Sequence, residues 1–404
     1  MKGTVLILYQ SGVYDQSAKA IEDYMNVNYR DYEVVAVDQD RFSYLFSAKI
    51  QRGLYKASAR LLPIFNNFVG PIRIGSKKDA DDRGSSNSTQ PKEVGEGSEV
   101  KVKYRKIDNV LKRFNPDVVL CLSPKSHDKA IKARKKLGKN MPIYAMTTDY
   151  CLDSDFINAL SDGYFVQNQQ VAQAMLASGV ENQKILIAGT CAKHSDKTYD
   201  RVAVCQKYGV DPTLPVILMI GGRYGCDYLK DAFSALGEYY RTVNLIVVTS
   251  GSKSLKNYIK TYCKSKGIDR NVSLVDNLQD MQELYSIACV LVTSPTAGVT
   301  FEAIANHLPM VLIKPMNSIE IGNYSYLTSQ SLAYCGAGKH QLLSSTLSLL
   351  NDEGEYAKAV SRLDGRGEDV TAMVCSILTD RAYEHRQSIP QPIEDDNTEE
   401  NKND

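Results

Sequence analysis

The segment from Val292 to Asn323 reads VTSPTAGVTFEAIANHLPMVLIKPMNSIEIGN, and it indicates the fold class of the whole chain. It opens at the end of an apolar β-type run, crosses a loop of small residues and enters a helical run at 299–306. A second apolar strand follows at 308–313. A strand that leads through a small-residue loop into a helix presents backbone N–H groups to an anion, typically a diphosphate.

The residues that we expect around such a diphosphate and its sugar lie in this loop, its helix and the loop after the second strand. The helix holds Glu302, whose carboxylate could reach ribose hydroxyls, and Glu320 and Asn323 form a polar pair suited to sugar hydroxyls. The candidate phosphate contacts are Ser294, Thr296, Ala297, Gly298 and Thr300. A plain α/β crossover with a glycine in its turn has the same spacing, so the spacing alone leaves both interpretations open.

This stretch resembles the donor-binding half of the GT-B glycosyltransferases. The most similar group holds the monogalactosyldiacylglycerol synthases, the bacterial diacylglycerol glucosyltransferases and the N-acetylglucosaminyltransferase of lipid II synthesis. The matching residues are Pro295, Gly298, Thr300, Glu302, Ala303, Glu320 and Asn323. Ser318 and Ile319 replace a Gly and a Gln of that group.

The first half of the chain carries further motifs of the same group in the same order. They are Pro116-Asp117-Val118-Val119, Thr148-Asp149-Tyr150, Asp162-Gly163-Tyr164-Phe165-Val166, Gly179-Val180 and Lys184-Ile185 to Gly189. The resemblance runs from the first strand to about residue 350. It implies an α/β protein of the GT-B class, with two Rossmann-like domains whose parallel sheets face a central cleft.

Domain limits follow from the resemblance and from composition. We expect an acceptor- and membrane-facing domain at 1–190, a linker near 190–212 and a nucleotide-sugar-binding domain at 213–385, with a final helix that crosses back to the first domain. Alternating strands and helices at 4–9, 17–25 and 33–38 favour a parallel sheet. Residues 76–100 are predicted to be a disordered insertion, and 386–404 an acidic disordered tail.

The second half offers further candidate donor contacts. Gly221 and Gly222 follow an apolar strand, where a Gly-rich turn lets the backbone approach a phosphate closely, and Gly251 follows a later strand. The loop with Asn277 and Leu278 resembles the loop that holds the uracil ring in the group.

The general base is not fixed by the sequence. The group has a His after its first strand, and Tyr14 stands at that place. A tyrosine with a pKa of about 10 is a poor base near neutral pH. Asp15 and Asp149 are the candidates for the catalytic base, and either could instead be structural. The helix N-terminus would stabilise a leaving diphosphate without a metal, so we expect no cofactor beyond a UDP-sugar donor substrate.

Basic charge concentrates in two stretches of the first half. Residues 41–78 hold eight Lys or Arg and no acidic residue, and 125–139 hold seven against one Asp. Aromatic residues interleave with the candidate membrane and acceptor contacts Arg41, Lys49, Arg52, Lys56 and Arg60. Such a segment is typical of binding to an anionic membrane surface, although its apolar face could equally cover the domain's own sheet. No nucleic-acid partner is expected.

The absence of an apolar run of 18 residues and nine dispersed cysteines favour a cytoplasmic protein, peripheral on the inner face of the membrane. Three functions remain open at this point. The chain could be an inverting transferase that moves a hexose or N-acetylhexosamine from a UDP-sugar to a lipid such as diacylglycerol. It could be a catalytically degenerate relative that binds a nucleotide-sugar or a partner. It could also be a UDP-sugar epimerase.

Overall fold

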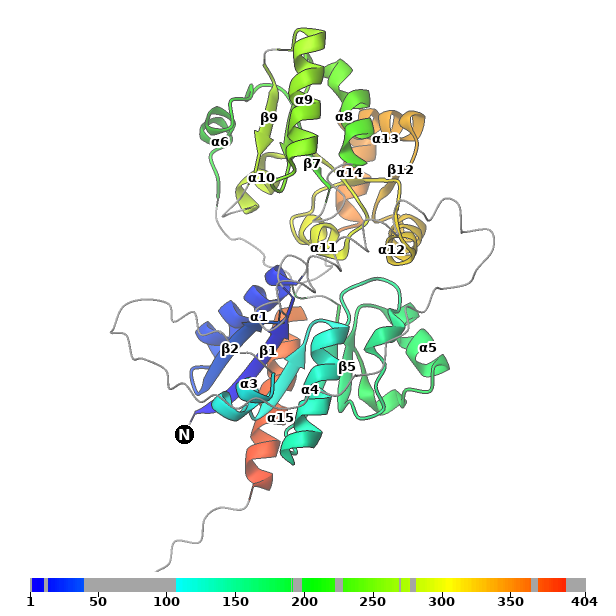
Figure 1. The fold of residues 1–404 in the computed structure, drawn as a ribbon. Helices are drawn as coiled ribbons and strands as arrows, with labels where there is room; N and C mark the ends of the chain where they lie inside the picture. Colours follow the sequence, from blue (N-terminus) through cyan, green and yellow to red (C-terminus); the bar gives the residue numbers. More distant parts are fainter. Residues whose placement is uncertain are drawn as a thin grey trace, which may run out of the picture.

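The computed structural model describes residues 2–10, 14–39, 107–189, 191, 198–221, 228–268, 270–276, 281–364 and 370–389. These residues form two α/β domains, stacked one above the other in Figure 1. Each domain is built on a six-stranded sheet in which every pairing is parallel. Two Rossmann-like domains with parallel sheets were predicted, and this prediction is confirmed.

The first sheet has the strand order β2-β1-β3-β4-β5-β6. Its central strands are short apolar runs that are buried on both faces, as parallel strands between two helical layers must be. The strands are β1 (Gly3–Tyr9), β2 (Tyr32–Asp38), β3 (Val118–Cys121), β4 (Ile143–Met146), β5 (Gly163–Val166) and β6 (Ile185–Ile187).

The second sheet has the order β12-β11-β10-β7-β8-β9. Its order reverses beside β7, and ligands of open α/β sheets bind outside the carboxyl ends of strands at such a reversal. The strands are β7 (Val216–Ile220), β8 (Asn244–Val248), β9 (Val272–Val275), β10 (Val290–Thr293), β11 (Met310–Ile313) and β12 (Tyr334–Gly336).

Helices cover both faces of each sheet. Helices α1 and α15 pack on one face of the first sheet, and α3 and α4 on the other. In the second domain α8, α9 and α13 cover one face, and α10, α11 and α12 the other. The bounds are α1 (Asp15–Asn28), α3 (Ile107–Phe114), α4 (Pro124–Leu137), α5 (Gln169–Ala177), α6 (Arg201–Lys207), α8 (Leu229–Leu236), α9 (Lys253–Lys266), α10 (Gln282–Ile287), α11 (Ala297–Ala305), α12 (Ser318–Ser329), α13 (Lys339–Asn351), α14 (Glu353–Ser361) and α15 (Val370–Ser388), with short 3₁₀ turns at Ser154–Phe156, Asn182–Lys184 and Gly237–Tyr239.

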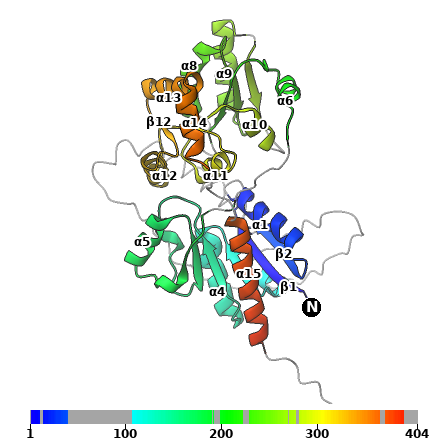
Figure 2. The ribbon, with the colours of Figure 1, turned by 180° about the vertical axis from the view of Figure 1, so that it is seen from behind.

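The domain limits differ from the expected ones at both ends of the second domain. Val204 and Cys205 of α6 are buried in the core of the second domain, which therefore begins before residue 213. Val374 and Leu378 of α15 are buried against β1 and β3, so α15 belongs to the first domain. Figure 2 shows α15 lying along the lower domain. The helix that was expected to cross back does so.

A buried histidine on α4 holds together three segments of the first domain. His127 is 1% exposed. Its Nδ1 lies 3.1 Å from the carbonyl oxygen of Phe156, and its Nε2 lies 2.9 Å from the Oγ of Ser161. Burial lowers the pKa of His127 to about 4, because the charged imidazolium loses its hydration there.

We expect His127 to make the protein less stable as the pH falls. Its pKa is lower in the folded chain than in the unfolded one, so its contribution is complete above pH 6.5 and declines as the pH falls toward 4. Between pH 7 and pH 5 the loss is about 2 kcal/mol. Urea unfolding at both pH values should show this loss in wild type and in His340→Gln, whose histidine is exposed. His127→Gln should be less stable at pH 7 but should lose less between the two pH values. An equal loss in all three proteins would contradict the assignment.

Candidate active site at the domain junction

The carboxyl ends of the two sheets meet at a junction of three segments. The first is 149–151, which follows β4 of the first domain. The others are 294–302 and 316–326, which follow β10 and β11 of the second domain. The sequence placed candidate site residues in all three segments, and the structure brings Asp149, Thr300 and Asn323 together there.

Asn323 is the hydrogen-bonding centre of this junction. Its side chain is 1% exposed on α12. Its Nδ2 donates to Asp149 Oδ1 at 2.8 Å and to the carbonyl oxygen of Pro295 at 3.1 Å, and its Oδ1 accepts from the backbone N–H of Tyr150 at 2.8 Å. Both amide hydrogens and the carbonyl oxygen of Asn323 are therefore engaged, and the bonds to Asp149 and Tyr150 join the two domains. Its predicted contact with a sugar stays a prediction.

Tyr150 carries the apolar half of the junction. It belongs to the first domain but is 1% exposed within the core of the second. Its ring lies 4.8 Å from that of Phe301 on α11 and stacks at 5.2 Å on that of Tyr326 on α12. Its hydroxyl lies 3.4 Å from the Oγ1 of Thr300. The ring thus fixes the distance between the two helices that hold the candidate donor residues.

The N-terminus of α11 is open to a ligand. The residue before the helix, Thr296, makes no side-chain cap, and its Oγ1 is buried without a hydrogen-bond partner among the described residues. Gly298 is exposed, and the first N–H groups of a helix have no partner within it. The Oγ of Ser294 donates to the carbonyl oxygen of Gly221 at 3.1 Å, which fixes the loop against the end of β7. This arrangement suits an anion.

Glu302 lies one turn further along α11 and is 6% exposed. The hydroxyl of Tyr285, on α10, donates to its Oε2 at 2.5 Å. Burial raises the pKa of Glu302 to about 7, although the hydrogen bond from Tyr285 opposes that shift. Burial and the neighbouring carboxylate raise the pKa of Tyr285 well above its usual value. Tyr285 was not predicted to be a site residue from the sequence. It lies within the short helix α10, and nothing in the local sequence indicates that it pairs with Glu302.

The other two candidate carboxylates sit in different surroundings. Glu320 accepts the backbone N–H of Met316 at 2.8 Å and so closes its own loop, and burial raises its pKa. Asp149 is half-buried at the junction. Burial raises the pKa of Asp149 to about 6, against the opposing hydrogen bond from Asn323. A carboxylate with this pKa is largely ionised at pH 7 and still basic enough to accept a proton.

The remaining candidates lie apart from the junction or outside the described residues. Gly251 follows β8 with φ of +75° and is exposed. Asp15 opens α1, and its side chain is not described. Those outside the described residues are Gly222, Asn277, Leu278, Arg41, Lys49, Arg52, Lys56 and Arg60. Within the described ranges no three His, Cys, Asp or Glu side chains are grouped as metal ligands.

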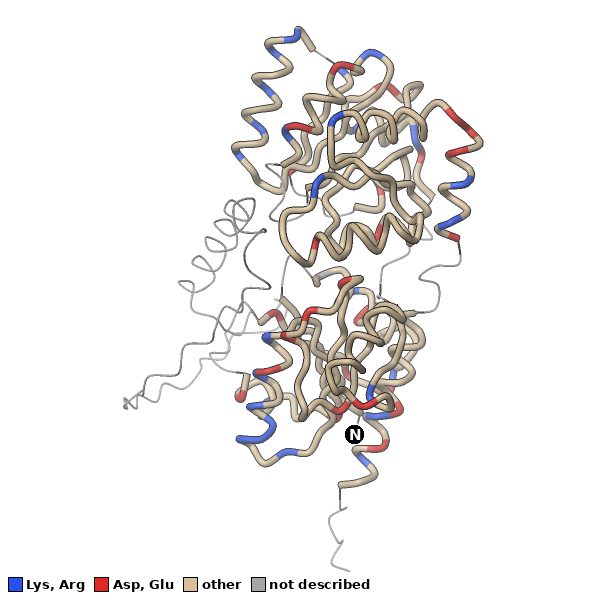
Figure 3. Tube along the Cα trace, turned by 90° about the vertical axis from the view of Figure 1, so that its right-hand side faces the viewer, with Lys and Arg blue, Asp and Glu red and all other residues tan. Residues whose placement is uncertain are grey.

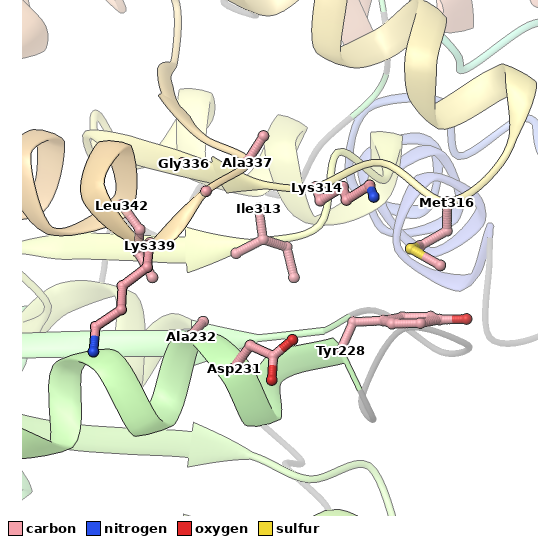
Figure 4. Close-up of a pocket in the computed structure, with 11 residues that line it drawn as sticks. Tyr228, Asp231, Ala232, Ile313, Lys314, Met316, Gly336, Ala337, Lys339 and Leu342 are labelled. Atoms are coloured by element: carbon pink, nitrogen blue, oxygen red, sulfur yellow. The ribbon is translucent and has the colours of Figure 1, made fainter. Parts of the chain in front are cut away.

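A pocket of about 150 Å³ lies beside the junction, between α8 and the loops that follow β11 and β12. Figure 4 shows Lys314 and Met316 near one end and Lys339 near the other, with Asp231 on α8 between them. None of the candidate site residues lines it. Met316 connects the two places, because its N–H donates to Glu320.

Comparison with known proteins supports this description. Residues 14–191 match the family model of the monogalactosyldiacylglycerol (MGDG) synthases. MurG from Acinetobacter baumannii superposes with a TM-score of 0.57 at 12% identity, over 94% of this chain and 99% of its own. The UDP-GlcNAc 2-epimerase from Neisseria meningitidis gives 0.59 at 12% identity, over 93% and 100%. The chain has the GT-B fold. The resemblance of this GT-B protein to the MGDG synthase group is thereby confirmed.

A relative at the level of sequence is the processive diacylglycerol beta-glucosyltransferase of Bacillus licheniformis. It is 23% identical over 255 residues, which are 63% of this chain and 65% of the relative. The GT-B chain thus spans just under two thirds of the length of that relative. None of its described helices has both the length and the apolar character that a bilayer crossing requires.

We expect Asn323→Ala to loosen the junction. The change leaves the backbone N–H of Tyr150 and the carboxylate of Asp149 without their partner, at a cost of about 3 kcal/mol. Urea unfolding should show this loss, and small-angle scattering should show a larger radius of gyration. The control is Asn317→Ala, which removes the cap of α12 at a cost of about 1 kcal/mol and keeps the bonds of Asn323 to Asp149 and Tyr150. A radius of gyration unchanged in Asn323→Ala would contradict this role.

Proposed function

We propose that this protein is a glycosyltransferase that moves a hexose or N-acetylhexosamine from a UDP-sugar to a lipid such as diacylglycerol, with inversion. One observation carries the proposal. Asn323 bonds both Pro295, just before the open N-terminus of α11, and the basic carboxylate of Asp149, which lies within the residues that match the MGDG synthase model. The diacylglycerol acceptor is suggested by the name of the Bacillus licheniformis relative.

The proposed chemistry uses the chain's own groups. Backbone N–H groups at the start of α11 bind the diphosphate and stabilise the charge that develops as the bond between it and the sugar breaks. The acceptor hydroxyl attacks the anomeric carbon from the opposite side and gives its proton to a carboxylate. Asp149 fits this role because its pKa of about 6 suits a base, and because Asn323 engages only its Oδ1 among the described residues. Asp15 remains the other candidate.

The proposed place of action is the surface of a membrane. A lipid acceptor is held in a bilayer, so the enzyme must reach it there, and we propose a peripheral attachment on the cytoplasmic face. The basic aromatic segment that holds Arg41 to Arg60 stays a predicted contact, and it lies outside the described residues.

The test is release of UDP from UDP-glucose, UDP-galactose and UDP-N-acetylglucosamine, with and without diacylglycerol in vesicles. We expect release with one donor that depends on the lipid. UDP binding without release would instead support a degenerate binding protein. Conversion of the donor to an isomer without lipid would support an epimerase.

In the same assay the change Asp149→Asn should lower turnover by about a hundredfold or more, because an amide cannot accept the proton. UDP affinity should stay within about threefold of wild type, since Asn can still accept the hydrogen bond from Asn323. Wild-type turnover in Asp149→Asn would exclude Asp149 as the base and leave Asp15→Asn to be tested in the same way.

We further expect Glu302→Gln to weaken UDP binding by about tenfold, because a ribose hydroxyl bonds more strongly to a carboxylate than to an amide. Since burial raises the pKa of Glu302 to about 7, wild-type affinity should rise between pH 6 and pH 8, and the Gln variant should respond less. Isothermal titration with UDP measures both effects. The control is Glu355→Gln on α14, because the hydroxyl of Tyr334, on β12, donates to Glu355 at 2.5 Å in a similar pair. Equal affinities for wild type and Glu302→Gln would contradict the ribose contact.

A further inference from the structure

The charges on the described helices are divided unequally between the two sides of the molecule. Helices α3 and α4 carry eight Lys or Arg against two Asp, and α9 carries five Lys and no acidic residue. On the opposite layers the balance is reversed. Helices α1 and α15 have three Lys or Arg and five Asp or Glu, and α10, α11 and α12 have three Glu and no Lys or Arg. The net charge of +1 for the whole chain hides this separation.

The positive helices of the two domains lie on the same side of the molecule. Figure 1 shows α3, α4 and α9 at the front of their domains. In the turned view of Figure 3, that front lies at the left, where blue residues follow α9 along the upper domain and also mark the lower domain. We call the exposed residues of these helices the basic face: Lys112, Arg113, Lys125, Lys129, Lys132, Lys135, Lys136, Lys253, Lys260, Lys264 and Lys266.

Part of the charge of α9 is not neutralised by the described acidic residues. On α9, ion pairs within the described residues involve Lys256, with Asp276, and Lys266, with Glu238 at 3.1 Å. The ammonium groups of Lys253, Lys260 and Lys264 take part in no ion pair with a described acidic residue. These three lysines are therefore available to an external anion.

Two tyrosines lie on the side of α9 that packs against α8, away from the three lysines. Tyr258 and Tyr262 are half-buried on α9, and their rings stack with centroids 6.4 Å apart. The ammonium group of Lys230, on α8, lies 5.8 Å from the Tyr258 ring, and that of Lys266 lies 5.9 Å from the Tyr262 ring. Lys253, Lys260 and Lys264 therefore form a separate exposed stripe of α9, at positions i, i+7 and i+11 of the helix.

We propose that the basic face lies flat against an anionic lipid surface, so that α9 of the second domain contacts the membrane together with α3 and α4 of the first. The proposal rests on the proposed function, and it adds the donor-binding domain to the contact. A lipid surface fits because it is planar and extends under both domains at once. The charges of α9 are all lysines, whose ammonium groups act as point charges toward a diffuse layer of phosphates rather than as the bidentate partners that Arg provides.

The test is vesicle sedimentation of the full chain without donor or acceptor, using 30% phosphatidylglycerol in phosphatidylcholine and phosphatidylcholine alone. The variant is Lys253→Gln/Lys260→Gln/Lys264→Gln. A lysine near an anionic leaflet raises the partition coefficient by a factor of roughly five. We therefore expect the variant to bind the anionic vesicles at least tenfold more weakly than wild type, and both proteins to bind neutral vesicles weakly.

The matched control is Lys19→Gln/Arg30→Gln/Arg381→Gln, which removes three exposed positive charges from the layer of α1 and α15. It should bind within about threefold of wild type. If both variants bound the anionic vesicles equally weakly, net charge alone would explain the binding, and the proposal would be overturned. The proposal would also be overturned if the triple lysine variant of α9 bound anionic vesicles within threefold of wild type. Preferential binding of a single-stranded oligonucleotide over the anionic vesicles would overturn it as well.

UDP titration and turnover on short-chain diacylglycerol in neutral detergent separate this inference from the proposed function. None of the three lysines lies at the junction, so the α9 variant should keep wild-type values in both assays. Lower turnover only on diacylglycerol in anionic vesicles would support the basic face. If no protein shows turnover in either assay, the proposed function fails, while the vesicle binding of the three proteins still decides whether α9 contacts the membrane.

Discussion

A buried carboxamide is central to the arrangement of the two domains. Asn323 donates to Asp149 of the first domain and to Pro295 in the loop before α11, and it accepts from the backbone of Tyr150. A buried amide is costly unless its groups are paired, so the junction is favourable only when all three segments are in place. The geometry of the α11 N-terminus and the position of Asp149 are therefore fixed by the same side chain.

This constraint conflicts with the role that the resemblance implies for Asn323. In the resembled group the equivalent residue is expected to bind the donor sugar, yet here its amide hydrogens and its oxygen are engaged by protein. A sugar hydroxyl could bind Asn323 only by displacing Asp149 or Tyr150 from it. Stacking of Tyr150 between Phe301 and Tyr326 opposes such a displacement, because withdrawal would expose an aromatic ring that is now 1% exposed. Binding of a sugar by Asn323 would therefore require the junction to rearrange.

The sequence predicted the strands and the candidate loop well, and the contacts between segments poorly. Runs such as Val118–Cys121 and Val290–Thr293 are apolar over their full length, which identifies buried parallel strands without further information. Helix α6 was placed in a linker, because its seven residues are too few to show a helical period. The pairs of Tyr285 with Glu302 and of Asp149 with Asn323 join residues 17 and 174 positions apart. Both depend on how helices and domains pack, which local sequence does not contain.

The junction and the charge pattern are linked by geometry. Helices α4 and α9 belong to different domains, and each domain folds around its own sheet. Their lysines form one basic face only because the contacts around Asn323 and Tyr150 hold the two sheets in a fixed relative orientation. Charges on a common plane act together on a planar anionic surface, whereas the same charges on differently oriented domains would not. A rotation at the junction would therefore alter both the candidate active site and the surface that we propose to face the membrane.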